Sequence, residues 1–228
     1  DMLMNTGQVF VQKSQMGGSS PVIRGFEASR VLMVIDGVRM NNAIYRAGHV
    51  QDCITIDPNM LERTEVIFGP SSTMYGSDAL GGTMHFYSRK PQLSTDDSAY
   101  ISARAMLRYT TANAEQTGHI DMNFGWKKWA LLTSLTRSDF GNLRMGANAN
   151  PAYGNYDWCR YYVVRHDSID SVYTNSDPLV QKYTGYSQLD LNQKILFQPN
   201  EKSSHLLNVQ YSTSTDIPRY DRLQQMSG

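Results

Sequence analysis

A polar stretch in the first quarter of the chain carries side chains that could bind a ligand. Residues 41–52 read Asn-Asn-Ala-Ile-Tyr-Arg-Ala-Gly-His-Val-Gln-Asp and include Tyr45, Arg46, His49 and Gln51. Tyrosine and histidine can ligate haem iron, and arginine can pair with a carboxylate. A solvated loop with its tyrosine packed inward is the open alternative. A second set of charged residues could form ion pairs, and it comprises Arg24, Glu62, Arg63, Glu65 and Arg89.

The sequence contains no recognisable catalytic constellation. Paired carboxylates, a nucleophile elbow and a zinc-binding helix motif are absent, and residues 69–76 lack the spacing and the lysine of a phosphate-binding loop. The remaining histidines are scattered without metal-ligand spacing, namely His85, His119, His166 and His205. The sequence therefore predicts that the protein is not an enzyme, and it assigns no cofactor and no metal site.

Composition narrows the class of protein further. The 228 residues include 21 Lys+Arg and 21 Asp+Glu, and this zero net charge argues against a nucleic-acid-binding protein, which normally has a basic excess. Apolar runs such as residues 31–35 are far shorter than the roughly 20 residues of a membrane-spanning helix. A membrane β-barrel stays open, because its strands alternate and average out as polar.

The first ninety residues have the pattern of a small α+β unit. Strands are expected at residues 8–13, 21–24, 31–35, 38–40, 64–68 and 83–88, with Asp36-Gly37 as a tight turn. Asp57-Pro58 predicts the start of a short helix that ends near Arg63, because Asp caps the first free amides and Pro suits the first helical position. A second short helix is expected from Ser71 or Ser72 to Tyr75.

After residue 95 the pattern changes to long strands with period-two alternation. Five such strands are expected, near residues 101–109, 119–126, 129–137, 189–197 and 207–212. Two connections are short, at residues 127–128 and 199–203, whereas those at 110–116 and 141–185 are longer. Short turns on one rim, long loops on the other and the Trp126/Trp129 pair are typical of an outer-membrane barrel. The alternative is a water-soluble β-sandwich fused to a small α+β domain.

Five strands cannot close a membrane barrel. Each open edge in lipid would leave backbone amides unpaired, at a cost of several kcal/mol per group. The sequence therefore predicts an α+β domain at residues 1–94 and an incomplete transmembrane barrel of antiparallel strands at 95–228, with a long extracellular loop at about 141–185. We expect the chain to be the N-terminal part of a larger protein.

Six ordered motifs between residues 21 and 91 resemble the plug domain of TonB-dependent outer-membrane receptors. They are Ile23-Arg24-Gly25, Val34-Ile35-Asp36-Gly37-Val38, Leu61-Glu62-Arg63-Thr64-Glu65-Val66, Gly69-Pro70-Ser71-Ser72-Thr73-Met74-Tyr75-Gly76, Ala79-Leu80-Gly81-Gly82-Thr83 and Arg89-Lys90-Pro91. The strand after the double glycine departs from the usual aliphatic pattern, since it reads Met84-His85-Phe86-Tyr87. In this family the plug lies inside a barrel of about 22 strands.

The resemblance implies active uptake of a scarce nutrient across the outer membrane of a Gram-negative bacterium. It implies that the apical loop bearing Tyr45, Arg46, His49 and Gln51 faces the substrate, which would be haem, a ferric siderophore, cobalamin, or an oligosaccharide or peptide. It implies that some of Arg24, Glu62, Arg63, Glu65 and Arg89 pair with the barrel wall and hold the plug closed; charge pairing within the plug is the alternative.

The resemblance also implies partners: the TonB complex of the inner membrane, through a segment not visible here, outer-membrane lipid and a surface lipoprotein. Nucleic acid is not expected as a partner. The alternative function is a non-transporting outer-membrane adhesin or assembly scaffold with the same fold, whose contact surface would be the loop at residues 141–185.

Overall fold

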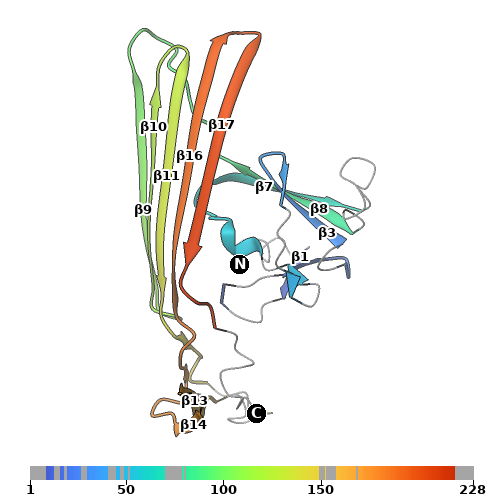
Figure 1. Ribbon diagram of the computed structural model, residues 1–228, viewed down its shortest axis with the longest axis vertical. Helices are drawn as coiled ribbons and strands as arrows, with labels where there is room; N and C mark the ends of the chain where they lie inside the picture. Colours follow the sequence, from blue (N-terminus) through green and yellow to red (C-terminus); the bar gives the residue numbers. More distant parts are fainter. Residues whose placement is uncertain are drawn as a thin grey trace.

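The computed structural model describes residues 9–12, 16–17, 20–26, 30–40, 45–46, 49–50, 52–69, 79, 81–148, 152, 158–167 and 169–218. Two bodies make up most of this part of the chain (Figure 1). We call the smaller one, formed by the described residues up to 94, the N-terminal unit. The larger one is a tall five-stranded sheet that we call the wall.

The N-terminal unit is built on a four-stranded sheet in the order β4-β3-β8-β7. These strands are β3 (Val31–Ile35), β4 (Val38–Arg39), β7 (Leu61–Phe68) and β8 (Gly82–Ser88). The central strands β3 and β8 run parallel and are almost entirely buried, which explains the continuous apolar character of β3. Strand β8 also buries the polar residues Thr83, His85 and Ser88. Two small pairs accompany the sheet: β1 (Val9–Gln12) with β2 (Ser20–Ile23), and β5 (Tyr45–Arg46) with β6 (His49–Val50).

The predicted turn at Asp36-Gly37 joins β3 to β4, and both residues have positive φ, at 47° and 84°. A hairpin turn of type I′ needs positive φ at both central positions, and Asp and Gly tolerate that conformation better than most other residues. The core beside this sheet is formed by Val9, Ile23, Val31, Met33, Ile56, Met84 and Phe86.

The helix predicted at residues 57–63 is wrong. The chain makes a turn at residues 58–59, and strand β7 starts at Leu61, while a short 3-10 helix, η3 (Asp52–Thr55), lies upstream. Asp57 caps the turn instead, because its Oδ1 accepts hydrogen bonds from the backbone and side-chain amides of Asn59. Pairing of β7 with β8 outweighs the local helix-start signal. The second predicted helix, at residues 71–75, lies outside the described residues.

The wall contains five antiparallel strands in the order β17-β16-β11-β10-β9. They are β9 (Tyr100–Thr110), β10 (Glu115–Gly125), β11 (Trp129–Phe140), β16 (Tyr186–Asn200) and β17 (Ser203–Ser214). The five predicted strands are therefore confirmed. The sheet does not close on itself, since β9 and β17 are both edges of this sheet.

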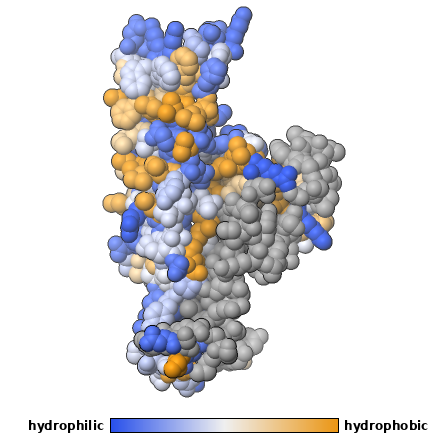
Figure 2. Space-filling model, in the orientation of Figure 1, coloured by the Kyte–Doolittle hydropathy of each residue, from blue (hydrophilic) through white to orange (hydrophobic). Residues whose placement is uncertain are grey.

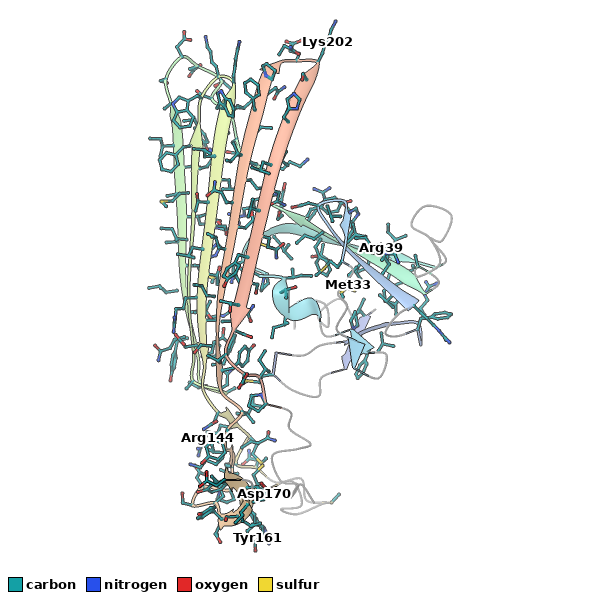
Figure 3. All side chains as sticks on the ribbon, in the orientation of Figure 1. Met33, Arg39, Arg144, Tyr161, Asp170 and Lys202 are labelled. Atoms are coloured by element: carbon teal, nitrogen blue, oxygen red, sulfur yellow. The ribbon has the colours of Figure 1, made fainter. Side chains whose placement is uncertain are left out.

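The long connection between β11 and β16, which the sequence predicts as a loop, contains strands. Strands β13 (Tyr161–His166) and β14 (Ile169–Thr174) form a hairpin, and β12 (Leu143–Arg144) pairs with β15 (Val180–Gln181). The hairpin lies beyond one end of the wall, and Figure 3 places Tyr161 and Asp170 there, opposite the turn that bears Lys202. Aromatic and β-branched residues in both hairpin strands account for the pairing. No helix among the described residues is long and apolar enough to cross a membrane.

The two faces of the wall differ in polarity, as the alternation predicts. The face toward the N-terminal unit, here the inner face, buries polar residues of β10, namely Glu115, Thr117, His119, Asp121 and Asn123. The outer face is largely apolar and exposed, for example at Ile101 and Leu107, and hydrophobic surface runs along the wall in Figure 2. Trp129 stacks on Phe197 near the short turns, with ring centroids 4.1 Å apart. This arrangement matches a lipid-facing band.

Candidate functional site

The most unusual feature of the molecule is a buried polar interface between the N-terminal unit and the inner face of the wall. Three segments of the unit reach the wall: the turn at Asp36, residues 54–59, and the strap, by which we mean residues 89–94. Around η3, the side-chain amide of Gln188 donates to the carbonyl of Ile54 at 2.7 Å, and that of Gln210 donates to the carbonyl of Thr55 at 2.8 Å. Wall side chains thus satisfy backbone groups of the unit.

The first charged contact is the Asp36–Lys194 anchor. The Nζ of Lys194 lies 2.9 Å from Asp36 Oδ2, and the Lys194 side chain is only 1% exposed. Asn208 of β17 donates to the same carboxylate oxygen at 3.0 Å, while the backbone N–H of Ser88 donates to Oδ1 at 2.8 Å. A buried ammonium is tolerated only when it is paired and hydrogen-bonded. The β3–β4 turn therefore fixes the unit to β16 and β17.

The second charged contact is the Asp121 cluster on β10. Asp121 Oδ2 accepts hydrogen bonds from Arg89 of the strap at 2.5 Å and from Arg104 of β9 at 2.8 Å. Its Oδ1 lies 3.0 Å from Nε2 of His119. Arg104 also donates to the backbone carbonyl of Asn59 at 2.9 Å, so it joins β9 to the unit. The buried Asp121 carboxylate thus holds the strap through Arg89. It also positions Arg104, which binds the turn at residues 58–59 of the unit.

A third contact links Asp57 of the unit to β11. The hydroxyl of Thr136 donates to Asp57 Oδ2, and Nδ1 of His119 lies 2.6 Å from that hydroxyl oxygen. Asp57, His119 and Thr136 are all at least nine-tenths buried. The carboxylate that caps the turn with one oxygen therefore binds the wall with the other, which the helix-start interpretation of the sequence did not consider.

The strap follows strand β10 along the inner face. The Asn123 side chain pairs with the backbone of Gln92, accepting from its N–H at 2.8 Å and donating to its carbonyl at 3.0 Å. The N–H of Ser94 donates to the carbonyl of Trp126 at 3.2 Å. Between these contacts lies Gly125, where a Cβ atom would overlap the carbonyl oxygen of Gln92 and lie 3.1 Å from the carbonyl carbon of Leu93. The strap can approach the wall this closely only because residue 125 lacks a side chain.

We expect the substitution Gly125→Ala to weaken the seating of the strap. The added methyl group overlaps backbone rather than a flexible side chain, and overpacking of this kind costs about 1–3 kcal/mol. Hydrogen exchange of residues 89–94 in the complete protein should rise. Gly146→Ala is the matched control, because a Cβ there meets nothing within 4 Å. Equal exchange in both variants would show that strap and wall are not in close contact.

The five charged residues that were predicted to form ion pairs lie in different surroundings in the structure. Arg89 contacts the wall, whereas Arg63 pairs with its neighbour Glu65 at 2.8 Å on the exposed side of β7. This hydrogen bond lowers the pKa of the Glu65 carboxyl. The guanidinium of Arg24 lies 5.0 Å from the ring centroid of Phe68, so its contact is with another residue of the unit. Glu62 lines a cavity of about 530 Å³ with Arg89, Arg104 and Asp121. A locking role for these five residues stays a prediction.

The ligand candidates lie on the small hairpin β5–β6. Its backbone register sets Arg46 opposite His49 and Tyr45 opposite Val50, which brings three of the four candidates onto one two-stranded element. Gln51 lies outside the described residues. Within the described ranges no group of three or more His, Cys, Asp or Glu residues could hold a metal ion. Their role in ligand contact stays a prediction.

Sequence reasoning missed most of the interface. Asp36, Asp57, Asp121 and Lys194 were not among the predicted site residues, although the last two stand at inner-face positions of alternating strands. A charged residue on the polar face of an alternating strand was the signal that could have indicated Asp121 and Lys194 as site residues. The sequence does not show which residue of the N-terminal unit each of them binds.

Comparison with known proteins finds a family match for the N-terminal unit. Residues 1–83 match the family model described as TonB-dependent Receptor Plug Domain. The fold is similar to that of the Copper transporter OprC, with a TM-score of 0.65, 15% identity, and 91% of this chain and 27% of that chain covered.

Two further structures have a similar fold. The FrpB iron transporter from Neisseria meningitidis gives a TM-score of 0.61 at 14% identity, and the siderophore receptor PirA from Acinetobacter baumannii gives 0.58 at 15%; each comparison covers 91% of this chain and 28% of that one. The N-terminal unit thus matches the family model of TonB-dependent receptor plug domains, and the chain has a fold similar to part of each of these three structures. The chain spans 27–28% of the length of these structures.

Proposed function

We propose that this chain forms the plug and part of the barrel of a TonB-dependent outer-membrane transporter that takes up a scarce nutrient. The observation that supports this most strongly is a plug-family domain seated by buried polar contacts on the inner face of a sheet whose outer face is apolar. A polar interface is suited to a plug that must move during transport. Its contacts exchange for water when the plug moves, whereas a large apolar interface would resist separation.

The division of labour follows the two bodies. Residues 1–94 act as the plug that closes the pore at rest, and residues 95–228 contribute wall strands and a loop that faces the outside of the cell. The location is the outer membrane of a Gram-negative bacterium. The partners are the TonB complex of the inner membrane, membrane lipid, the substrate and a surface lipoprotein. Proteins with this fold include copper and iron transporters and a siderophore receptor, which favours transport over catalysis.

The test is growth of a deletion strain on limiting nutrients. We expect a defect confined to one nutrient class among haem, ferric siderophores, copper, cobalamin and oligosaccharides or peptides. Complementation with the complete gene should restore growth. Wild-type uptake of every nutrient, in a strain whose outer membrane lacks the protein, would contradict a transport function.

A ligand role for the β5–β6 hairpin gives a narrower prediction. If haem is the substrate, His49→Ala should slow growth on haem as the sole iron source, because an axial ligand is lost. Growth on inorganic iron and the amount of protein in the outer membrane should not change. The exposed residue Asp97 offers a control, since Asp97→Ala alters a side chain on a surface turn. Unchanged growth on haem would count against His49 as a ligand.

The alternative function, a non-transporting adhesin or scaffold, gains some support from the β13–β14 hairpin. Tyr161, Ile169 and Val172 are 57%, 70% and 51% exposed beyond the end of the wall. An exposed apolar hairpin of this kind could bind another surface component. A deletion strain with normal uptake but lost adhesion or assembly would favour this reading.

A further inference from the structure

The outer face of the wall changes character near the end that carries the long connection. Register aligns Ala105, Ile120, Leu135 and Leu191 in one apolar row across β9, β10, β11 and β16. Two residues further along each strand the row reads Leu107, Gly118, Arg137 and Leu189, and the next row reads Tyr109, Gln116, Asp139 and Ser187. The apolar band therefore ends in a polar rim, and Arg137 stands at the boundary. In a membrane this boundary is where lipid headgroups lie.

A hollow interrupts the outer face at this boundary. It has a volume of about 550 Å³ and is lined by β9, β10 and β11, including Leu107, Tyr109, Gln116, Gly118, Arg137 and Asp139. Gly118 is directly between Leu107 and Arg137 in the register, so the absence of a side chain there opens the floor of the hollow. We call this hollow the rim notch. Leu107, Gly118 and Arg137 border it on the side of the apolar band, and Tyr109, Gln116 and Asp139 border it on the side of the polar rim.

The guanidinium of Arg137 is oriented by Asp139, two residues further along the same strand. Its Nε and Nη2 each donate to Asp139 at 3.1 Å, and the hydroxyl of Ser187 on β16 donates to Asp139 in turn. This fork uses two of the five N–H donors of the guanidinium. The N–H groups of Nη1 and the second N–H of Nη2 remain available as donors. One N–H from each nitrogen can donate to two oxygens of a phosphate. The Arg137 side chain is 63% exposed, so a ligand can reach it.

We propose that the rim notch binds the phosphate-bearing headgroup of a membrane lipid, with the phosphate on Arg137 and the start of an acyl chain along Leu107 and over Gly118. A lipid suits the site better than a free anion because Leu107 lies in the same row as Arg137 and the apolar row of Ala105, Ile120 and Leu135 adjoins the notch on the membrane side. Asp139 partly offsets the charge of Arg137, so a bare anion gains little, whereas an anchored amphiphile also gains from burial of its chain. The proposal rests on the proposed placement of the wall in the outer membrane.

The test uses the complete protein purified in detergent, with retained lipid measured by native mass spectrometry. Dioleoyl phosphatidic acid and dioleoyl phosphatidylcholine are the probes, since they share acyl chains and differ in how accessible the phosphate is. We expect phosphatidic acid to be retained preferentially. Arg137→Gln should weaken its retention by about tenfold or more, because a hydrogen-bonded charge is lost. Gly118→Leu keeps the charge but fills the notch, and it should weaken retention similarly.

Lys202→Gln is the matched control, since it removes one exposed positive charge at the opposite end of the wall (Figure 3). It should leave retention unchanged. Heat-modifiable migration in gels establishes that each variant barrel is folded, and the comparison of two lipids on the unaltered protein does not depend on any variant. Equal retention of both lipids, equal loss in all three variants, or displacement by excess inorganic phosphate would overturn the proposal. These results leave the transport proposal intact, because nutrient-limited growth tests it separately.

Discussion

The substitution Asp36→Asn is expected to loosen the plug more than any other single change on its surface. Asparagine keeps the size of the side chain and tolerates the positive φ of this turn, so the backbone should be preserved. The Lys194 ammonium, with a side chain 1% exposed, would lose its countercharge inside the interface. Removing one partner of a buried ion pair costs about 3–5 kcal/mol. Hydrogen exchange of residues 31–39 and 82–88 in the complete protein should rise, and under the proposed function the outer membrane should admit large antibiotics.

Two further variants separate the charge effect from general damage. Combining Asp36→Asn with Lys194→Met removes the uncompensated charge and should recover most of the lost protection, since an apolar replacement of a buried pair is often neutral. Glu65→Gln breaks the exposed pair with Arg63 and should change little, because exposed pairs contribute little to stability. If Asp36→Asn exchanged no faster than the unaltered protein, the anchor would have no role in seating the plug.

The second large effect is expected from Asp121→Ala. This change removes the acceptor shared by Arg89 and Arg104 and the oxygen near His119. Because the two arginines are partly exposed, the loss should be smaller than at a fully buried pair, about 2–3 kcal/mol. Protection of residues 89–94 should fall most, since Arg89 holds the strap. Exchange rates of that segment give the measurement.

The control for this prediction is Asp177→Ala in the β12–β15 region. Asp177 also accepts a hydrogen bond from an arginine, Arg144, at 2.6 Å, and this contact lowers the pKa of its carboxyl. It lies far along the chain from the strap, so protection of residues 89–94 should not change. Similar exchange of the strap in the Asp121 and Asp177 variants would argue that the strap is held by its backbone contacts alone.

Residue patterns predicted much of the fold because they act locally. Alternation of apolar and polar residues identified the five wall strands, and the side of each strand that bears Asp121 or Lys194 follows from the same period of two. The turn at Asp36-Gly37 was predicted because positive φ restricts the residues that can occupy it. Strands β13 and β14 were missed because they are short and lie in a segment that is otherwise rich in polar residues.

The helix prediction at Asp57 shows where local signals fail. The same carboxylate could cap a helix or a turn, and the sequence gives no way to see Thr136 approaching its second oxygen. The pairing of β7 with β8 and the contact with β11 decide between the two conformations. The same limit applies to the charged residues of the motifs, because no local pattern shows that Arg89 reaches the wall while Arg63 pairs with Glu65.

Local patterns were enough to predict the five wall strands and the polarity of each face, since both depend on neighbours a few residues away. Which charges meet depends on the tertiary structure: Asp36 with Lys194 and Arg89 with Asp121 are brought together across 158 and 32 positions of chain by the docking of the N-terminal unit on the wall. The physical reason is that an ion pair depends on distance in space. The sequence encodes that distance only through the whole set of packing contacts, not through any local pattern.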